Sequence, residues 1–264
     1  MTSPSIWRRA TYAAACLLSS AVLFAEPVNV RFSEGLVHGF LKLSSLDGTA
    51  LADGDLIQTA HGTRVTSRLV FHFKDGSVHD ETGVFSQRGQ LRLVSYRLTQ
   101  RGPSFPRPLE MSIAATGETT VRFTDEHGQS KTEREQIAIP ADLANGIVLT
   151  MLKNVRTDAP PSELSMIVAT PKPRLVKLKL QKPYEDRFST GGMQRKAAHY
   201  VLKVDIGGLA GLIAPIAGKE PPDSHVWILE GEAPAFVKSE QQLFMDGPLW
   251  RIELVSPVWP RSFN

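Results

Sequence analysis

The chain has 264 residues, of which 42% are hydrophobic and 22% are charged, and its formal net charge is +3. A chain of this length can bury a sizeable core without help from disulfides or metals. The sequence has no basic patch with interleaved aromatic residues, so we expect no nucleic-acid partner. Its single cysteine, Cys16, excludes an internal disulfide and a structural cysteine–zinc site.

The first 25 residues have the order of a secretory signal peptide. Arg8 and Arg9 supply the positive charge, and an apolar run leads to Ala25, the expected cleavage site. The run is shorter than the ~20 apolar residues that cross a bilayer. Lipid attachment at Cys16 is the alternative use of this segment. We therefore expect an exported protein whose remaining part, residues 26–264, forms a single domain.

The segment FHFKDGSVHDE, residues 71–81, predicts a β-hairpin around residues 75–76, which are Asp-Gly. That pair suits a type I′ turn, which needs positive φ at both central positions. In this register His72 faces His79, and Glu81 shares their face, so the three side chains are candidate metal ligands. The plainer interpretation is a half-buried hairpin with its histidines on the solvated face. We expect no cofactor.

Alternating segments separated by turn residues predict an antiparallel meander through most of the chain. Val176, Leu178 and Leu180 alternate with lysines and are expected to face inward. His199 is interpreted as an ordinary strand residue. The predicted fold class is mainly β: a strongly curved antiparallel sheet, either a half-barrel or an open barrel, that encloses one or two helices. The expected strands cover residues 90–100, 109–115, 119–124, 131–139, 165–170, 174–181, 197–206, 226–229, 236–240 and 249–255.

Two apolar segments interrupt this pattern. Residues 139–155 predict a helix that is apolar on most sides, which indicates an enclosed helical plug near residues 141–154. Gly146 within it allows either close packing on the sheet or the approach of a ligand. Residues 206–219 predict a short buried helix or an apolar lip that touches acyl chains or a membrane.

The candidate ligand-binding residues come from these two apolar segments. Each also has a plainer interpretation as core, because apolar residues at helical spacing normally pack in the interior. They are Leu143, Ile147, Met151, Leu212, Ile213 and Ile216.

The tract AHYVLKVDIGGLAGLIAPIAGK, followed by HVWILEGEAPAFVKSE and PLWRIELVSP, resembles an uncharacterised family of exported bacterial proteins. That family is similar to the periplasmic lipoprotein carriers and their outer-membrane receptor. The resemblance implies a curved sheet around an apolar cavity plugged by helices, in the periplasm or at the outer membrane. It assigns no catalytic residue. The hairpins before Asp142 either extend the same sheet or form an additional subdomain.

Together these patterns predict a non-catalytic protein of the cell envelope that binds a lipid, an acyl chain or another apolar partner. The expected partner is a lipid, a lipoprotein acyl chain, or a protein of the outer membrane or envelope. One alternative is a scaffold or assembly factor that pairs through its sheet edges. Another is a hydrolase with an unrecognised site, although the sequence contains no GxSxG or zincin motif. Neither the ligand nor the oligomeric state follows from the sequence.

Overall fold

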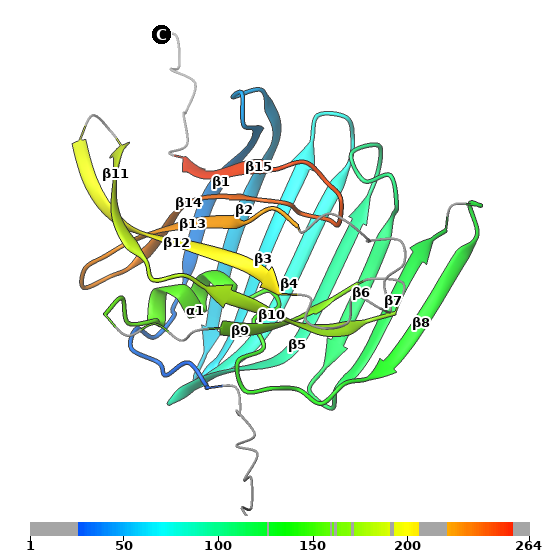
Figure 1. Cartoon of the computed structure of the whole chain (residues 1–264), viewed down its shortest axis with the longest axis horizontal. Helices are drawn as coiled ribbons and strands as arrows, with labels where there is room; N and C mark the ends of the chain where they lie inside the picture. Colours follow the sequence, from blue (N-terminus) through cyan, green and yellow to red (C-terminus); the bar gives the residue numbers. More distant parts are fainter. Residues whose placement is uncertain are drawn as a thin grey trace, which may run out of the picture.

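The computed structural model describes residues 26–125, 127–158, 160, 163–169, 172–190, 193–205 and 221–255. Within these ranges the chain is mostly antiparallel β-structure with one short α-helix (Figure 1). The expected signal segment with Cys16 lies outside the described residues, as do Leu212, Ile213 and Ile216, so their roles stay predictions. The described ranges contain no helix that is both long and apolar enough to cross a membrane.

The strands follow one another along the sheet nearly in sequence order, as expected for a meander. The order is β8-β7-β6-β5-β4-β3-β2-β1-β15-β14-β13-β12-β10-β9, and β11 pairs with β12 beside this path. The structure adds β1, β2 and β11 to the strands predicted above. The bounds are β1 Val37–Ser45, β2 Ala50–His61, β3 Arg64–Phe73, β4 Val78–Arg88, β5 Gln90–Arg101, β6 Leu109–Ala114, β7 Glu118–Thr124, β8 Ser130–Gln136, β9 Glu163–Val168, β10 Arg174–Leu180, β11 Tyr184–Thr190, β12 Met193–Asp205, β13 Ser224–Leu229, β14 Ala235–Gln241 and β15 Trp250–Val255.

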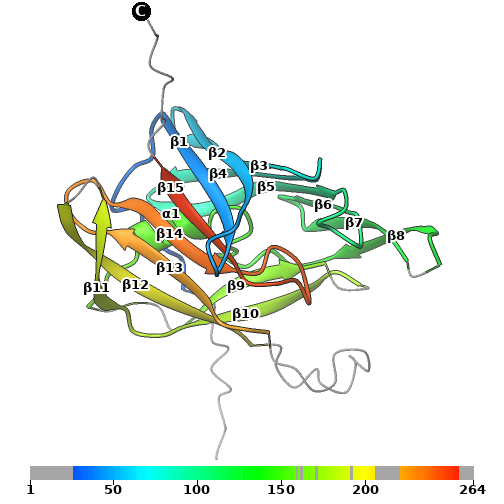
Figure 2. The ribbon, with the colours of Figure 1, turned by 90° about the horizontal axis from the view of Figure 1, so that it is seen from above.

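The sheet rolls around an interior that contains the helix. Strands β1–β8 form one wall, and β9, β10 and β12–β15 cross in front of it (Figures 1 and 2). Register shifts in the β1–β2 and β4–β5 ladders help to bend the sheet. The end strands β8 and β9 do not pair with each other in the described part of the chain, so the sheet stays open. The predicted open, curved antiparallel sheet around a helix is confirmed, and the hairpins before Asp142 belong to the same sheet.

The helix is shorter than the sequence predicts. Helix α1 covers Val148–Asn154, whereas residues 140–147 form mainly turns. Gly146 has a φ of 68°, a left-handed conformation that does not occur inside an α-helix. Leu143 instead forms a parallel β-bridge with Ser165 of β9. The predicted N-terminal half of the helix was therefore wrong, because its backbone pairs with a strand.

In the described part of the chain, two groups of buried hydrophobic side chains pack inside the rolled sheet. The larger surrounds α1 and includes Met151, and the smaller joins β5–β7 to β9 and includes Leu143. Val176, Leu178 and Leu180 face the interior as predicted. The two walls are therefore held apart by the helix and the loop before it, with packed side chains on either side.

The segment before β1 holds the C-terminal end of α1. The Oδ1 atom of Asn154 accepts hydrogen bonds from the backbone N–H groups of Arg31 and Phe32, at 2.7 and 2.8 Å. Lys153 forms an ion pair with Glu34, and both side chains are largely buried. These contacts fix the position of a helix that is too short to be stable alone.

Candidate ligand cavity

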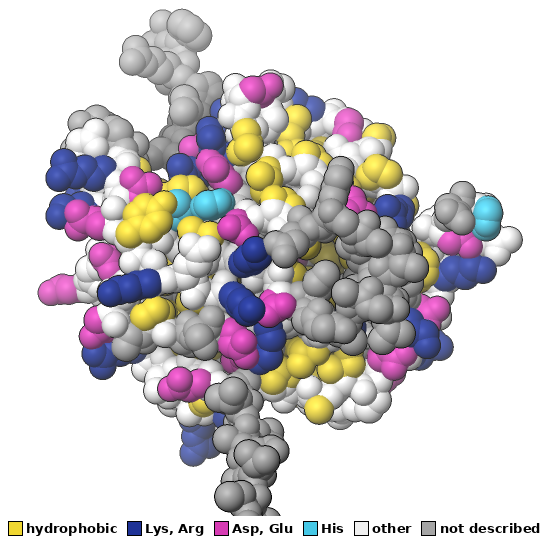
Figure 3. Space-filling view, viewed as in Figure 1, with side chains coloured by type: hydrophobic (Ala, Val, Ile, Leu, Met, Phe, Trp, Pro, Cys, Tyr) yellow, Lys and Arg dark blue, Asp and Glu magenta, His cyan; other side chains and the backbone are white. Residues whose placement is uncertain are grey.

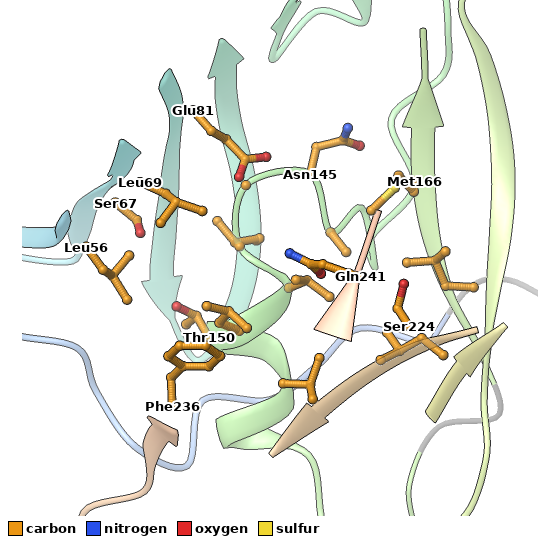
Figure 4. Close-up of a pocket in the computed structure, with 18 of the residues that line it drawn as sticks. Leu56, Ser67, Leu69, Glu81, Asn145, Thr150, Met166, Ser224, Phe236 and Gln241 are labelled. Atoms are coloured by element: carbon orange, nitrogen blue, oxygen red, sulfur yellow. The ribbon is translucent and has the colours of Figure 1, made fainter. Parts of the chain in front are cut away.

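A cavity of about 1190 Å³ lies between the two walls of the rolled sheet. Its lining is mostly apolar, and it includes Leu56 and Leu69 from one wall and Met166 and Phe236 from the other (Figure 4). Typical small-molecule pockets have volumes of ~300–1,000 Å³. The space is therefore large enough for a long or bulky apolar molecule.

The hairpin between β3 and β4 contains a three-residue loop and not the expected two-residue turn. The N–H of Gly76 donates to the carbonyl oxygen of Phe73, and the N–H of Phe73 donates to that of Ser77. Gly76 has a φ of 85°, and it is the single loop residue with positive φ. This geometry is a type I turn followed by a left-handed glycine, the common alternative to a type I′ hairpin.

The longer loop changes the face on which the β4 side chains lie. A register shift of one residue moves alternate side chains to the opposite face of a strand. His79 pairs with Phe71, and its side chain is 3% exposed on the inner face, which Glu81 shares. His72 pairs with Val78 and is exposed on the outer face. The predicted His72–His79 pair was therefore wrong, and these side chains with Glu81 cannot bind one metal ion. Within the described residues no cluster of three or more potential metal ligands occurs.

Glu81 projects from β4 into the cavity (Figure 4). The Tyr96 hydroxyl, from β5, donates a hydrogen bond of 2.8 Å to its Oε1 atom. Enclosure by protein raises the pKa of the Glu81 carboxyl, and the Tyr96 hydrogen bond opposes this effect. Enclosure and the neighbouring acid also raise the pKa of the Tyr96 phenol, which therefore stays a hydrogen-bond donor.

His79 is the second titratable group on this part of the wall. Burial lowers its pKa to about 4, so the imidazole is neutral near pH 7. Its Nδ1 atom lies 3.1 Å from Nε2 of Gln100, and that amide nitrogen also donates to the Leu243 carbonyl oxygen at 2.6 Å. Because an amide nitrogen only donates, Nδ1 of His79 accepts and the proton lies on Nε2. Among the described residues, Nε2 has no hydrogen-bond partner.

The loop before α1 is attached to both walls at two adjacent residues. Asn145 donates to the carbonyl oxygen of Ile167 and accepts from its N–H, both at 2.8 Å, as a paired strand would. Gly146 packs against Gly83 of β4, where an added Cβ on Gly83 would lie 2.9 Å from the Gly146 carbonyl oxygen. The interpretation of Gly146 as a point of close packing on the sheet is confirmed.

No family model and no curated protein matches this chain. Among solved structures, the chain is similar to a β-barrel-like protein of a domain of unknown function, DUF1849, from Brucella abortus. The two share 9% sequence identity with a TM-score of 0.44, over 87% of this chain and 100% of the other. The resemblance to the lipoprotein carriers therefore stays a prediction.

The candidate ligand residues of the sequence occupy two kinds of position. All three described residues are buried in the two packed hydrophobic groups, and Ile147 also borders the cavity, whereas Leu143 and Met151 do not. The sequence did not single out Tyr96 or Gln100, which hold the polar groups of the wall. The sequence could not distinguish them, because each lies in a strand whose alternate positions are also polar and would be expected on the solvated face.

A second polar cluster lies on the outer face of the sheet over β11–β14, where Figure 3 shows histidines beside hydrophobic and charged side chains. His199 stacks on Trp227 with 4.0 Å between ring centroids, and its Nε2 atom lies 2.9 Å from Nδ1 of His225. The Trp227 indole N–H donates to Asp186, and Lys238 lies over the indole ring. His199 is therefore more buried than the expected ordinary strand residue, and its neighbours form a packed polar layer.

Proposed function

We propose that this protein binds an amphiphilic molecule, such as a lipid or an acyl chain, in the cavity between the two walls. The observation that carries the proposal is the mostly apolar space of about 1190 Å³ between the two walls. Apolar surface removed from water contributes ~25 cal/mol per Å², so an acyl chain in this space gains most of its binding free energy from burial.

The contacts that fix the position of α1 support the same proposal. Asn154 and the Lys153–Glu34 ion pair hold one end of the helix, and Asn145 holds the loop at the other end. A cavity whose walls are already ordered loses less conformational entropy when a ligand binds. The ligand therefore does not have to order the plug before it gains contacts.

The proposal includes a place of action in the cell envelope. The charge and apolar run before Ala25 support export to the periplasm or the outer membrane. Lipids and lipoprotein acyl chains are the apolar molecules expected in that compartment. Sequencing the N-terminus of the protein recovered from a bacterial periplasm tests this part, with cleavage after about Ala25 as the expected result.

The sheet edges give less support to a scaffold that pairs through exposed strands. The edge strand β8 has mostly exposed, charged side chains, which discourage pairing with another chain. The edge of β9 that faces away from β10 forms a β-bridge with Leu143 and hydrogen bonds with the Asn145 side chain. We therefore place the function in the cavity.

A hydrolase remains the second candidate because Glu81, with its raised pKa, has a property of general acids. In the described part of the chain, its hydrogen bond goes to Tyr96, and that of His79 goes to Gln100. Neither group is joined to a serine or threonine nucleophile there. Conversion of an ester ligand by the wild type but not by E81Q would favour catalysis over binding.

The binding proposal is tested on the full chain, expressed in a bacterial periplasm and purified without detergent. Denaturation followed by mass spectrometry is expected to release a lipid in near-stoichiometric amount. Met166→Trp places a bulky ring in the cavity and is expected to abolish the co-purified lipid. Leu46→Trp is the matched control, because Leu46 is 43% exposed and outside the cavity. Folded protein that carries no lipid and takes up no fluorescent acyl probe would overturn the proposal.

A further inference from the structure

The polar groups of the cavity are concentrated on one strand and its neighbour. His79 and Glu81 are two residues apart on the inner face of β4, which places them ~7 Å apart along the strand. Tyr96 and Gln100 on β5 hold the two groups in place. The rest of the cavity near them is formed by aliphatic side chains such as Leu69 and Leu98.

These two groups offer hydrogen bonds of complementary kinds. The Nε2–H of His79 is a buried donor with no acceptor among the described residues. Among the described residues, Glu81 receives one hydrogen bond, from Tyr96 at Oε1, and its second oxygen is left for another partner. Because an unpaired buried polar group costs ~1–3 kcal/mol, a ligand that pairs with both groups gains affinity and orientation.

Among the described residues, no cation contributes to the pKa of either His79 or Glu81. Apart from Glu81, the described charged residues that border the cavity are Arg31, Glu34, Lys153, Arg174, Glu232 and Asp246. None of them contributes to the pKa shift of Glu81, which is caused by enclosure and the Tyr96 hydrogen bond. His79 is neutral near pH 7 and so supplies no positive charge. An anionic head group at Glu81 would therefore lie beside an acid that has no cation next to it.

We infer that the β4 wall recognises an uncharged hydroxylated head group, such as the glycerol of a monoacylglycerol, and rejects a free carboxylate. A hydroxyl donates to Glu81 and accepts from His79, whereas an ester alone only accepts and an ammonium only donates. This inference rests on the proposed binding of an amphiphile in the same cavity. It adds the chemical class of the head group and the residues that select it.

The test measures the affinity of delipidated wild-type protein for four amphiphiles of equal chain length at pH 8. These are a monoacylglycerol, a fatty-acid methyl ester, a fatty acid and an alkylamine, each used below its micelle concentration. We expect the monoacylglycerol to bind most tightly and the fatty acid to bind about tenfold or more weakly, with the ester between them. E81Q, which keeps the shape of the side chain, is expected to reduce that ratio to about threefold or less by improving fatty-acid binding.

Several outcomes would overturn the inference. A fatty acid that binds as tightly as the monoacylglycerol contradicts it, and this comparison needs only the wild-type protein. Tightest binding of the alkylamine shows a cation site at Glu81 instead. A ratio that E81Q leaves unchanged, in a variant with a wild-type circular dichroism spectrum, removes Glu81 from recognition. If folded protein binds none of the four, the proposed function itself fails.

Discussion

Phe71 lies opposite His79 in the β3–β4 ladder, and this pairing determines which polar groups reach the cavity. With a two-residue turn, His79 and Glu81 would lie on the solvated outer face. The third loop residue places them inside, beside Tyr96 and Gln100. A loop at the surface thus decides the chemistry of the interior.

The buried His79 is expected to make stability depend on pH. Its folded pKa is about 4, whereas the ordinary value is 6.5, so the unfolded chain binds a proton first as the pH falls. Its stabilising contribution is present above pH 6.5 and is lost as the pH falls toward 4, by on the order of 3 kcal/mol. His79→Asn keeps an acceptor for Gln100, and it should remove this loss in urea unfolding between pH 7 and pH 4.5.

Glu81 has the opposite effect and provides the internal control. Because its folded pKa is raised, its contribution is fully present below its ordinary pKa of 4.5 and is lost as the pH rises through the folded value. E81Q should therefore remove the loss of stability that occurs as the pH rises, whereas His79→Asn removes the loss that occurs as the pH falls. Identical pH profiles for the wild type and His79→Asn would show that the pKa of His79 is not lowered in the folded protein.

Gly83 is expected to tolerate no side chain. A Cβ at this position would meet the carbonyl oxygen of Gly146 at 2.9 Å, and backbone cannot move aside as a side chain can. We expect Gly83→Ala to reduce the free energy of unfolding by ~1–3 kcal/mol. Gly35→Ala is the control, because an added Cβ there meets no atom within 4 Å. Equal midpoints of chemical denaturation for the two variants would refute the close packing of the loop on β4.

Asn145 is expected to contribute strongly to stability. Asn145→Ala leaves the N–H and carbonyl groups of Ile167 without their partners in the interior. The expected loss is ~2–4 kcal/mol, the sum of two buried hydrogen bonds. Asn29→Ala, at an exposed asparagine, should change stability by less than ~0.5 kcal/mol. If thermal and urea unfolding show that Asn145→Ala changes the free energy of unfolding as little as Asn29→Ala does, the hydrogen bonds between the loop and β9 do not stabilise the protein.

The ion pair between Lys153 and Glu34 is expected to matter more than an exposed one. Their side chains are 13% and 6% exposed, against 61% and 50% for Lys196 and Glu185. Lys153→Met leaves a buried carboxylate unpaired and should cost ~3–5 kcal/mol. Lys196→Met should cost at most ~1 kcal/mol. The prediction fails if both variants unfold at the same urea concentration, since burial would then make no difference.

Much of the fold followed from local patterns, because strand alternation and turn residues act over a few neighbours. The inward positions of Val176, Leu178 and Leu180 needed only a period of two. The candidate site followed less well. Ile147 borders the cavity but is also a buried member of the larger hydrophobic group, so its role stays a prediction. Glu81 was a candidate ligand of a metal site that the register does not allow.

By itself, the sequence determined that this chain forms an antiparallel meander around an apolar plug, since alternation, glycine turns and apolar runs are local properties. Only the tertiary structure decided the length of the plug and the lining of the cavity. Helix α1 begins at Val148 because Asn145 and Gly146 pack on distant strands, in competition with helix formation. Glu81 faces inward because of the loop type at Gly76, and local propensity left two turn types open there. Interactions between residues far apart in the chain settled both choices.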